Sequence, residues 1–204
     1  MKMTKIEKKF VNSKGHAQKN IELIDQLFSK VDLSNVNKVL EIGCGVGVVS
    51  AHLNKNYKMD VVGTDLDQEQ IKIAKIYNKM NENLKFIKAD AIKLPFENNK
   101  FEIILSLWVM HHINDWGRAL KEINRVLKPK GFLIFSDLAY SKILLSVGNM
   151  VNSIRIFNPI VKNYGFYTIN DIIHFLKKNN FEIIYKEKPK GVIFKNHTIV
   201  FQKN

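Results

Sequence analysis

Long apolar runs alternate with amphipathic segments along most of this chain. The apolar runs lack a regular hydrophobic and polar alternation, which is typical of strands covered on both faces. The segments between them repeat apolar residues at helical spacing. This β-then-α order predicts a doubly wound α/β fold with a mostly parallel sheet. The expected strands are 37–43, 59–65, 83–90, 101–107, 131–138, 181–187 and one that ends at 201, and the expected helices are one ending near 56 and 67–80, 115–127 and 169–178.

Turns and helix faces add detail to this outline. The turn Pro189–Gly191 joins the last two strands, so we expect them to form an antiparallel pair at one end of the sheet. A second turn, Lys128–Gly131, should lead into the strand 131–138. In the helix 67–80, the apolar residues Ile71, Ala74 and Tyr77 recur at helical spacing.

Two segments depart from the regular order. Residues 1–30 precede the first strand and look helical from about Ala17, with Ile21, Ile24, Leu27 and Phe28 on one face. Residues 139–167 take the place of the next helix, and they carry an apolar stripe without acidic residues: Ile143, Leu144, Val147, Met150, Val151 and Ile154. We predict one domain, 1–204, with an N-terminal helical cap at 1–30 and a lid-like insertion at 139–167. The alternative is that the stripe is part of the core.

The strongest chemical signal lies in Val39–Ser50, where an apolar strand runs through Gly43, Gly45 and Gly47 into a helix. Glycines at such a turn let the backbone approach a ligand, and the helix offers free N–H groups and a positive dipole end. Asp65 ends the next strand, 18 residues beyond Gly47, where a carboxylate can accept hydrogen bonds from both hydroxyls of a ribose. An adenosine-containing ligand is therefore expected.

Two details bear on which adenosine ligand this is. A dinucleotide fingerprint would place a glycine or alanine at position 48, where this chain has Val48, so NAD is the less favoured ligand. The third strand ends in Asp90 and Ala91, which puts a second carboxylate at the same edge of the sheet. That carboxylate could accept a hydrogen bond from the amino group of adenine.

In order and spacing, five segments resemble the class I S-adenosylmethionine-dependent methyltransferases, and among them the small-molecule branch similar to the ubiquinone and menaquinone biosynthesis enzymes. The resemblance covers Val36–Leu138 and rests on LEIGCGVG, GTDLD, KADAIKLPFENNKFEIILSL, MHHI and KEINRVLKPKGFLIFSD. It implies a seven-stranded, Rossmann-like sheet with the methyl donor across its carboxyl edge. The implied reaction transfers a methyl group from S-adenosylmethionine to a small acceptor and releases S-adenosylhomocysteine.

The resemblance also implies which residues surround the donor. The turn residues would hold the methionyl part of the donor, and the aspartates at the strand ends would bind its ribose and adenine. The end of the fourth strand would line the bottom of the donor site. The implied donor-binding residues are Glu41, Gly43, Cys44, Gly45, Gly47, Asp65, Leu66, Asp90, Ala91, Ser106 and Leu107. The apolar segment 143–161, with Phe166 and Tyr167 beyond it, favours a partly hydrophobic or aromatic acceptor.

Histidines supply the candidate catalytic groups. His111 and His112 follow the fourth strand and would lie just beyond the sulfonium of the donor. Because histidine titrates near neutrality, one of them could act as a general base; the alternative is that they only hydrogen-bond a neighbouring loop. No metal site is expected, since adjacent residues project in different directions and no third ligand is apparent. His16 could fold over the carboxylate of the donor, or could be an exposed residue at a helix start.

Composition and charge leave further functions open. The 204 residues are 46% hydrophobic and 25% charged, as in a globular chain, and 32 basic against 19 acidic residues give a net charge of +13. This charge leaves nucleic-acid binding open but does not favour it, because 29 of the basic residues are Lys and 3 are Arg, whereas phosphate-binding sites usually use arginine forks. The alternatives are an RNA or protein methyltransferase, a donor-binding module without catalysis and a nicotinamide-dependent dehydrogenase.

The single cysteine, Cys44, cannot form an internal disulfide, which fits a reducing compartment. The N-terminus lacks the apolar core of a signal peptide, and no stretch approaches the ~20 apolar residues of a membrane span. We therefore expect a cytoplasmic protein without a transmembrane segment.

Overall fold

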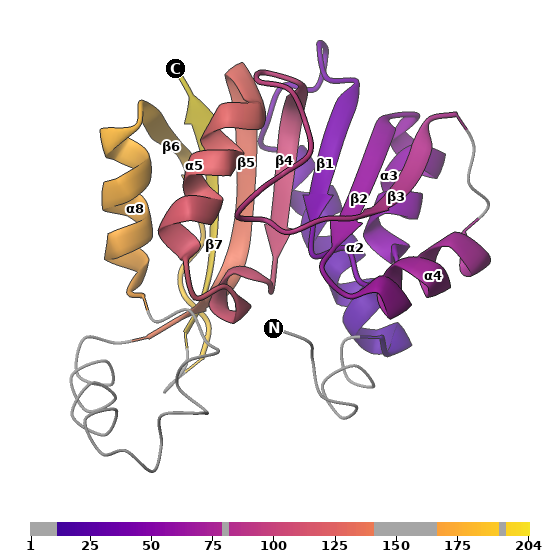
Figure 1. Ribbon diagram of the computed structural model, residues 1–204. Coiled ribbons are helices and arrows are strands. Elements are labelled where there is room, and N and C mark those ends of the chain that lie inside the picture. Colours follow the sequence, from indigo (N-terminus) through magenta and orange to yellow (C-terminus); the bar gives the residue numbers. More distant parts are fainter. Residues whose placement is uncertain (1–11, 79–81, 141–166, 192–194) are drawn as a thin grey trace.

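The computed structural model describes residues 12–78, 82–140, 167–191 and 195–204, in which seven strands form one sheet (Figure 1). The strands are β1 (Lys38–Ile42), β2 (Asp60–Asp65), β3 (Leu84–Lys88), β4 (Phe101–Leu107), β5 (Leu127–Ala139), β6 (Phe181–Lys186) and β7 (Lys195–Lys203). The helices are α2 (Lys14–Phe28), α3 (Val48–Tyr57), α4 (Gln68–Tyr77), the 3-10 helix η1 (Met110–His112), α5 (Trp116–Val126) and α8 (Ile169–Lys178).

The sheet has the strand order β3-β2-β1-β4-β5-β7-β6. The first five strands of this order are parallel to their neighbours, whereas β7 is antiparallel to both β5 and β6. The predicted doubly wound, mostly parallel sheet with an antiparallel C-terminal strand is therefore confirmed. The parallel order brings the carboxyl ends of β1 to β5 to one edge of the sheet.

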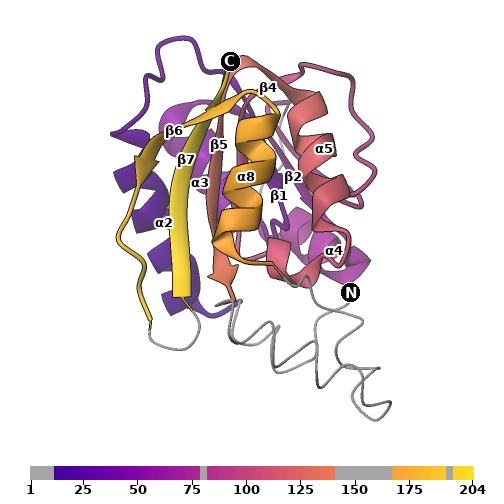
Figure 2. The same ribbon diagram turned by 90° about the vertical axis from the view of Figure 1, so that its left-hand side faces the viewer.

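Helices cover both faces of the sheet, with α2 and α3 on one side and α5 and α8 on the other (Figure 2). Successive residues of a strand point to opposite faces, so Val39 packs in the core beneath α2, α3 and α4, whereas Leu40 packs in the core beneath α5 and α8. Both faces are buried, which explains why the strands are apolar throughout.

The end of α4 differs from the prediction. The helix was expected to reach residue 80 but ends at Tyr77, and Asn78 has an extended backbone. The amide of Asn78 donates to the carbonyl oxygens of Ala74 (2.8 Å) and Val46 (2.9 Å), and these bonds stand in place of a further helical turn. Tyr77, which was expected to share an apolar face with Ile71 and Ala74, is 80% exposed.

The start of β5 also differs from the prediction. The strand begins at Leu127, so the expected turn Lys128–Gly131 is a bulge within β5, and the register between β4 and β5 shifts there. A Cβ on Gly131 would lie 2.8 Å from the backbone oxygen of Glu102. The close approach of β4 therefore requires a glycine in this bulge.

The two irregular segments are described only in part. The six residues of the apolar stripe fall on 141–166, outside the described residues, so the lid-like insertion stays a prediction. At the N-terminal end, α2 begins at Lys14, three residues before the expected start. Ile24, Leu27 and Phe28 of α2 are buried in the core that α3 shares.

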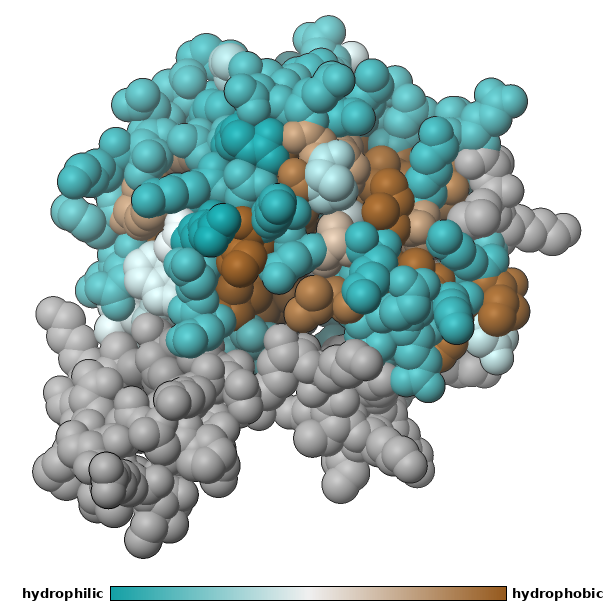
Figure 3. Space-filling model, viewed as in Figure 1, coloured by the Kyte–Doolittle hydropathy of each residue, from teal (hydrophilic) through white to brown (hydrophobic). Residues whose placement is uncertain are grey.

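Hydrophilic residues cover most of the described surface on the face seen in Figure 3, and hydrophobic residues gather across its middle. The lysine pair at the end of α8, Lys177 and Lys178, is exposed, as expected for a solvated face. In the part of the chain that the structure describes, no helix is both long and apolar enough to span a bilayer.

Candidate active site

The turn between β1 and α3 depends on three glycines in the left-handed region of backbone space. Gly43, Gly45 and Gly47 have φ values of 71°, 54° and 79°. A Cβ on Gly43 would lie 2.5 Å from Val109, and one on Gly47 would lie 2.4 Å from the ring of Phe86. At Gly45, by contrast, the nearest atom lies 3.9 Å away. The turn is therefore packed tightly at its ends and open at its centre.

A cavity lies above this turn, at the carboxyl edge of the sheet. Its wall comes from the β1–α3 turn, the ends of β2, β3 and β4, and the start of α2. Most of the residues that the sequence indicated for the site meet here, although His16 and His112 lie 96 positions apart. The indicated residues that line the cavity are Glu41, Gly43, Cys44, Gly45, Asp65, Leu66, Asp90, Ala91, Leu107, His112 and His16.

Three other indicated residues are not part of the described lining. Gly47 lies at the N-cap of α3 and packs against Phe86. Ser106 is fully buried within β4. His111 contacts Asp137 on β5 instead.

The carboxylate of Asp65 is fixed at the centre of the cavity wall. Its Oδ2 accepts a hydrogen bond from the N–H of Gly45 (3.0 Å), and its Oδ1 accepts one from the N–H of Asp67 (2.8 Å). Asp65 therefore ties the end of β2 to the glycine turn.

Beneath the turn lies a second carboxyl group, that of Glu41. The hydroxyl of Ser50 donates to its Oε2 at 2.5 Å. Burial raises the pKa of Glu41 to about 7, against the opposing effect of the Ser50 hydrogen bond and with a smaller contribution from Asp65. Burial likewise raises the pKa of Cys44, so this side chain stays a thiol at neutral pH.

The charges around the cavity are mostly negative. Asp65, Asp90 and the partly ionised Glu41 line it, and among the described lining residues none is Lys or Arg, although the net charge of the chain is +13. The titratable nitrogen bases in the wall are His16 and His112. This set of charges fits an adenosine ligand that carries a sulfonium and an ammonium group, and it opposes the phosphates of a dinucleotide.

The start of α2 contributes residues that the sequence indicated weakly or not at all. Ser13 caps the helix, and its hydroxyl accepts a hydrogen bond from the N–H of His16 (3.3 Å). The ring of His16 lies 5.9 Å from that of Trp108, edge to face. Burial lowers the pKa of His16, and Lys19 adds to this effect. Asn12, Ala17 and Asn20 line the cavity beside His16. The helical spacing of apolar residues did not indicate which end of α2 would reach the site.

Asp137 is the main residue that the sequence analysis missed. It is fully buried in β5 and accepts hydrogen bonds from the N–H groups of Met110 (2.6 Å) and Leu138 (2.7 Å). Asp137 also accepts a longer hydrogen bond from the N–H of His111 (3.4 Å) and contacts Nδ1 of the same residue. Burial raises the pKa of Tyr167, and the charge of Asp137 adds to it. Asp137 is the only acidic residue of β5, a signal that could have identified it.

The two adjacent histidines have different surroundings. His112 lines the cavity, and its ring centre lies 4.0 Å from that of His111, which contacts Asp137. The pair therefore links the buried carboxylate to the cavity wall. Over the residues that the structure describes, no group of three His, Cys, Asp or Glu side chains could hold a metal ion.

Residues 40–135 match the family described as "Methyltransferase domain". The methyltransferase GfsG of Streptomyces halstedii is 30% identical over 138 residues, which are 66% of this chain and 50% of GfsG. A demethylmenaquinone methyltransferase of Staphylococcus saprophyticus is 28% identical over 111 residues, which are 53% of this chain and 48% of that protein. The chain thus spans about half the length of these curated relatives.

A similar fold occurs in the crystal structure of a SAM-dependent methyltransferase from Methanosarcina mazei. The two share 21% identity with a TM-score of 0.65, over 87% of this chain and 96% of the other. The strand order, the cavity at the carboxyl edge and the sequence matches agree with the resemblance seen in the sequence. We conclude that the chain belongs to the class I S-adenosylmethionine-dependent methyltransferases.

Proposed function

We propose that this protein transfers the methyl group of S-adenosylmethionine to a nucleophilic atom of a small, partly hydrophobic or aromatic acceptor. The observation that carries the proposal is the charge of the cavity. Two aspartates, Asp65 and Asp90, and the partly ionised carboxyl group of Glu41 lie in its wall without a described Lys or Arg, in a chain with a large excess of lysine. Such a cavity favours a cationic nucleoside over an anionic dinucleotide.

The donor-binding roles follow from the chemistry of each group. Glu41 and the turn Gly43–Gly47 hold the methionyl part, where the carboxylate attracts its ammonium group. Asp65 accepts hydrogen bonds from the ribose hydroxyls, because its carboxylate ends β2 in the cavity wall beside the glycine turn. Asp90 accepts one from the amino group of adenine. Leu66 is 39% exposed at the cavity and packs against the purine ring.

Methyl transfer requires little covalent chemistry from the protein. The donor supplies a methyl group on a positively charged sulfur, which an acceptor nucleophile attacks in line. The residues around the cavity hold the two reactants in line and exclude water. Leu107, Trp108 and Val109 form the apolar part of the wall beside the glycine turn, and they serve this purpose.

The acceptor must lose a proton, and His111 and His112 are the groups that we propose for this step. Asp137 accepts hydrogen bonds from the N–H groups of Met110 and Leu138. Its contact with Nδ1 of His111 adds a further donor to this side chain, which places the proton of His111 on Nδ1. The Nε2 atom of His111 then carries the lone pair that a general base needs. His112 lines the cavity beside the ring of His111, so it takes the proton from the acceptor and passes it to Nε2 of His111.

A small acceptor is supported by the relatives rather than by the cavity. The name of one relative, a demethylmenaquinone methyltransferase, describes action on demethylmenaquinone rather than on a macromolecule. The lysine excess of this chain is instead the feature that would suit RNA.

Calorimetry and thermal unfolding with S-adenosylhomocysteine and with NAD test the donor. A ligand at 100 times its dissociation constant adds about 2.7 kcal/mol to the free energy of unfolding. We expect stabilisation by S-adenosylhomocysteine and none by NAD, and the reverse result would refute the proposal.

Transfer of a labelled methyl group to a short-chain naphthoquinol, to total RNA and to protein tests the acceptor. Turnover of the small acceptor that is insensitive to salt supports the proposal. Turnover confined to RNA, with a steep loss between 50 and 200 mM salt, would replace the small acceptor by a nucleic acid. Tight donor binding without turnover on any of the three would indicate a donor-binding module.

A further inference from the structure

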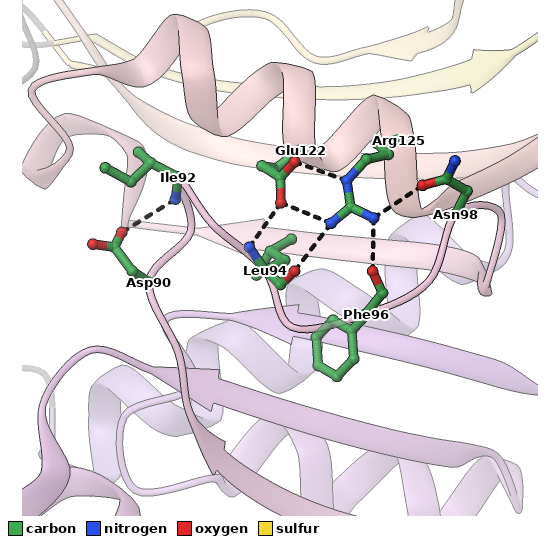
Figure 4. A network of polar contacts seen from close by, with 7 residues as sticks. All are labelled: Asp90, Ile92, Leu94, Phe96, Asn98, Glu122 and Arg125. Carbon is green, nitrogen blue, oxygen red and sulfur yellow. Dashed lines mark hydrogen bonds and ion pairs between the residues drawn. The ribbon is translucent and has the colours of Figure 1, made fainter.

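Arg125, on α5, holds the loop that follows β3. Its Nη1 donates to the carbonyl oxygen of Phe96 (2.6 Å) and to the side-chain oxygen of Asn98 (3.0 Å), and its Nη2 donates to the carbonyl oxygen of Leu94 (3.0 Å). Figure 4 shows the guanidinium group facing this loop from the helix. One side chain therefore fixes three positions within five residues of the loop.

Glu122 completes this arrangement one turn earlier on α5. Its Oε1 accepts a hydrogen bond from Nε of Arg125 (2.8 Å), and its Oε2 accepts bonds from Nη2 of Arg125 (2.8 Å) and from the N–H of Leu94 (2.8 Å). The hydrogen bond from Arg125 lowers the pKa of Glu122, so this residue is a carboxylate at neutral pH. Both peptide groups of Leu94 are thus held by one charged pair, which we name the α5 clamp (Glu122 and Arg125).

The chemistry of the α5 clamp requires arginine. Two parallel N–H groups of a guanidinium can bind a carboxylate while the remaining ones reach backbone oxygens, whereas lysine offers a single charged nitrogen. This chain has 29 lysines and 3 arginines, and one of the arginines is at this position. Arginine is rare in this chain, and it occurs at position 125, where the planar guanidinium group is required.

The α5 clamp lies a few residues from Asp90 in the cavity wall. The N–H of Ile92 donates to Oδ1 of Asp90 (3.1 Å), and the N–H of Lys93 donates to its carbonyl oxygen (3.0 Å). Leu94 follows directly and is buried in the core. On the other side, the N–H of Ala89 donates to the carbonyl oxygen of Asp65 (3.0 Å). Asp90 is therefore held between β2 and the α5 clamp.

We propose that Glu122 and Arg125 are positioning residues that set the carboxylate of Asp90 against the amino group of the donor's adenine. They thereby determine how strongly the enzyme distinguishes adenine from a purine that lacks this amino group. The inference rests on the proposed function, because it takes the cavity as the site of an adenosine donor.

The test compares S-adenosylhomocysteine with S-inosylhomocysteine, in which an oxygen replaces the amino group of adenine. Calorimetry measures both dissociation constants for the full chain. A hydrogen bond to a charged acceptor predicts that the wild type favours the adenine compound by about tenfold or more. In Arg125→Lys and in Glu122→Gln this preference should fall at least threefold, and Asp90→Ala should abolish it.

Glu102→Gln is a matched control. Glu102 also accepts a backbone N–H (Lys38, 2.6 Å) and contacts a basic side chain (Lys128), and its side chain is 18% exposed, as is that of Glu122. It lies at the start of β4, at the opposite edge of the sheet from the cavity. A general loss of stability would affect both variants alike, whereas a positioning role changes the preference only in Glu122→Gln.

The outcomes separate the two proposals. If the wild type does not bind S-adenosylhomocysteine, the proposed function fails and the inference fails with it. If the wild type binds and prefers it, but the clamp variants keep the same ratio of dissociation constants, the inference alone is wrong. Equal wild-type affinity for the two compounds would also overturn it, since Asp90 would then not recognise the amino group. Should Arg125→Lys fail to fold, Glu122→Gln decides the question.

Discussion

Glu41 makes the stability of the protein depend on pH in a direction opposite to that of most carboxylates. The group is fully enclosed beneath the glycine turn, and burial raises its pKa from 4.5 to about 7. In the unfolded chain it ionises near its ordinary value. Between pH 4.5 and 7 the native state therefore binds more protons than the unfolded state, so the stability that Glu41 contributes is complete below pH 4.5 and is lost as the pH rises through 7.

The size of this effect follows from the shift. One pKa unit corresponds to 1.36 kcal/mol, so a rise of about 2.5 units predicts a loss of about 3 kcal/mol between pH 4.5 and 7.5. Glu41→Gln cannot ionise and should lose this dependence, while its amide can still accept the hydrogen bond of Ser50. The variant should therefore be about as stable as the wild type at pH 5 and more stable at pH 8.

Urea unfolding of the ligand-free protein at pH 5, 6, 7 and 8 measures the effect. The control is Glu97→Gln, which removes one negative charge at an exposed loop position. The difference between wild type and Glu41→Gln should grow by about 1 kcal/mol per pH unit up to pH 7, and the control should follow the wild type. Parallel curves for wild type and Glu41→Gln would show that this carboxyl group is not buried as described.

Three further predictions concern the donor, the base and the turn. Asp65→Ala should weaken binding of S-adenosylhomocysteine by about 1.5–3 kcal/mol in calorimetry, because the ribose hydroxyls lose a charged acceptor; unchanged affinity would contradict this role. Asp137→Asn and His111→Ala should each lower kcat by roughly 10²–10⁴ while leaving donor affinity unchanged, and a variant with full kcat would exclude that residue from proton transfer. Gly47→Ala should lower the free energy of unfolding by about 1–3 kcal/mol, because its φ is 79° and its Cβ would meet Phe86 at 2.4 Å; a neutral effect in urea unfolding would show that the turn can relax.

The fold could be predicted because local pattern and global architecture agree. Strands that are apolar on both faces require helices on both sides, and regular βα order requires parallel pairing. The proximity of Asp65 and Asp90 could be predicted for the same reason, since each follows or ends a parallel strand and all such ends meet at one edge of the sheet. Departures came where a side chain or a neighbouring backbone altered a boundary, as the Asn78 amide does at the end of α4.

The partner of His111 could not be found by the same logic. Asp137 lies 26 residues further along the chain, and its contact with His111 depends on the register between β4 and β5. That register includes a bulge of several residues, which no apolar pattern encodes. The approach of His16 to the cavity likewise depends on how α2 crosses the sheet. The amphipathic period of α2 determines only which face of the helix is buried.

Charge decides between the adenosine ligands that the glycine turn alone leaves open. A dinucleotide would place its pyrophosphate at the start of α3, beside Glu41 and Asp65. At about 5 Å and an effective dielectric of about 20, a phosphate charge beside an ionised carboxylate costs about 3 kcal/mol, and the described lining offers no lysine or arginine to offset it. Glu41, with a pKa of about 7, contributes only part of this cost at neutral pH. A sulfonium or ammonium at the same distance gains a similar amount from each ionised carboxylate. The proposed function therefore assigns recognition of an adenosine to the turn and selection of a cation to the carboxylates around it.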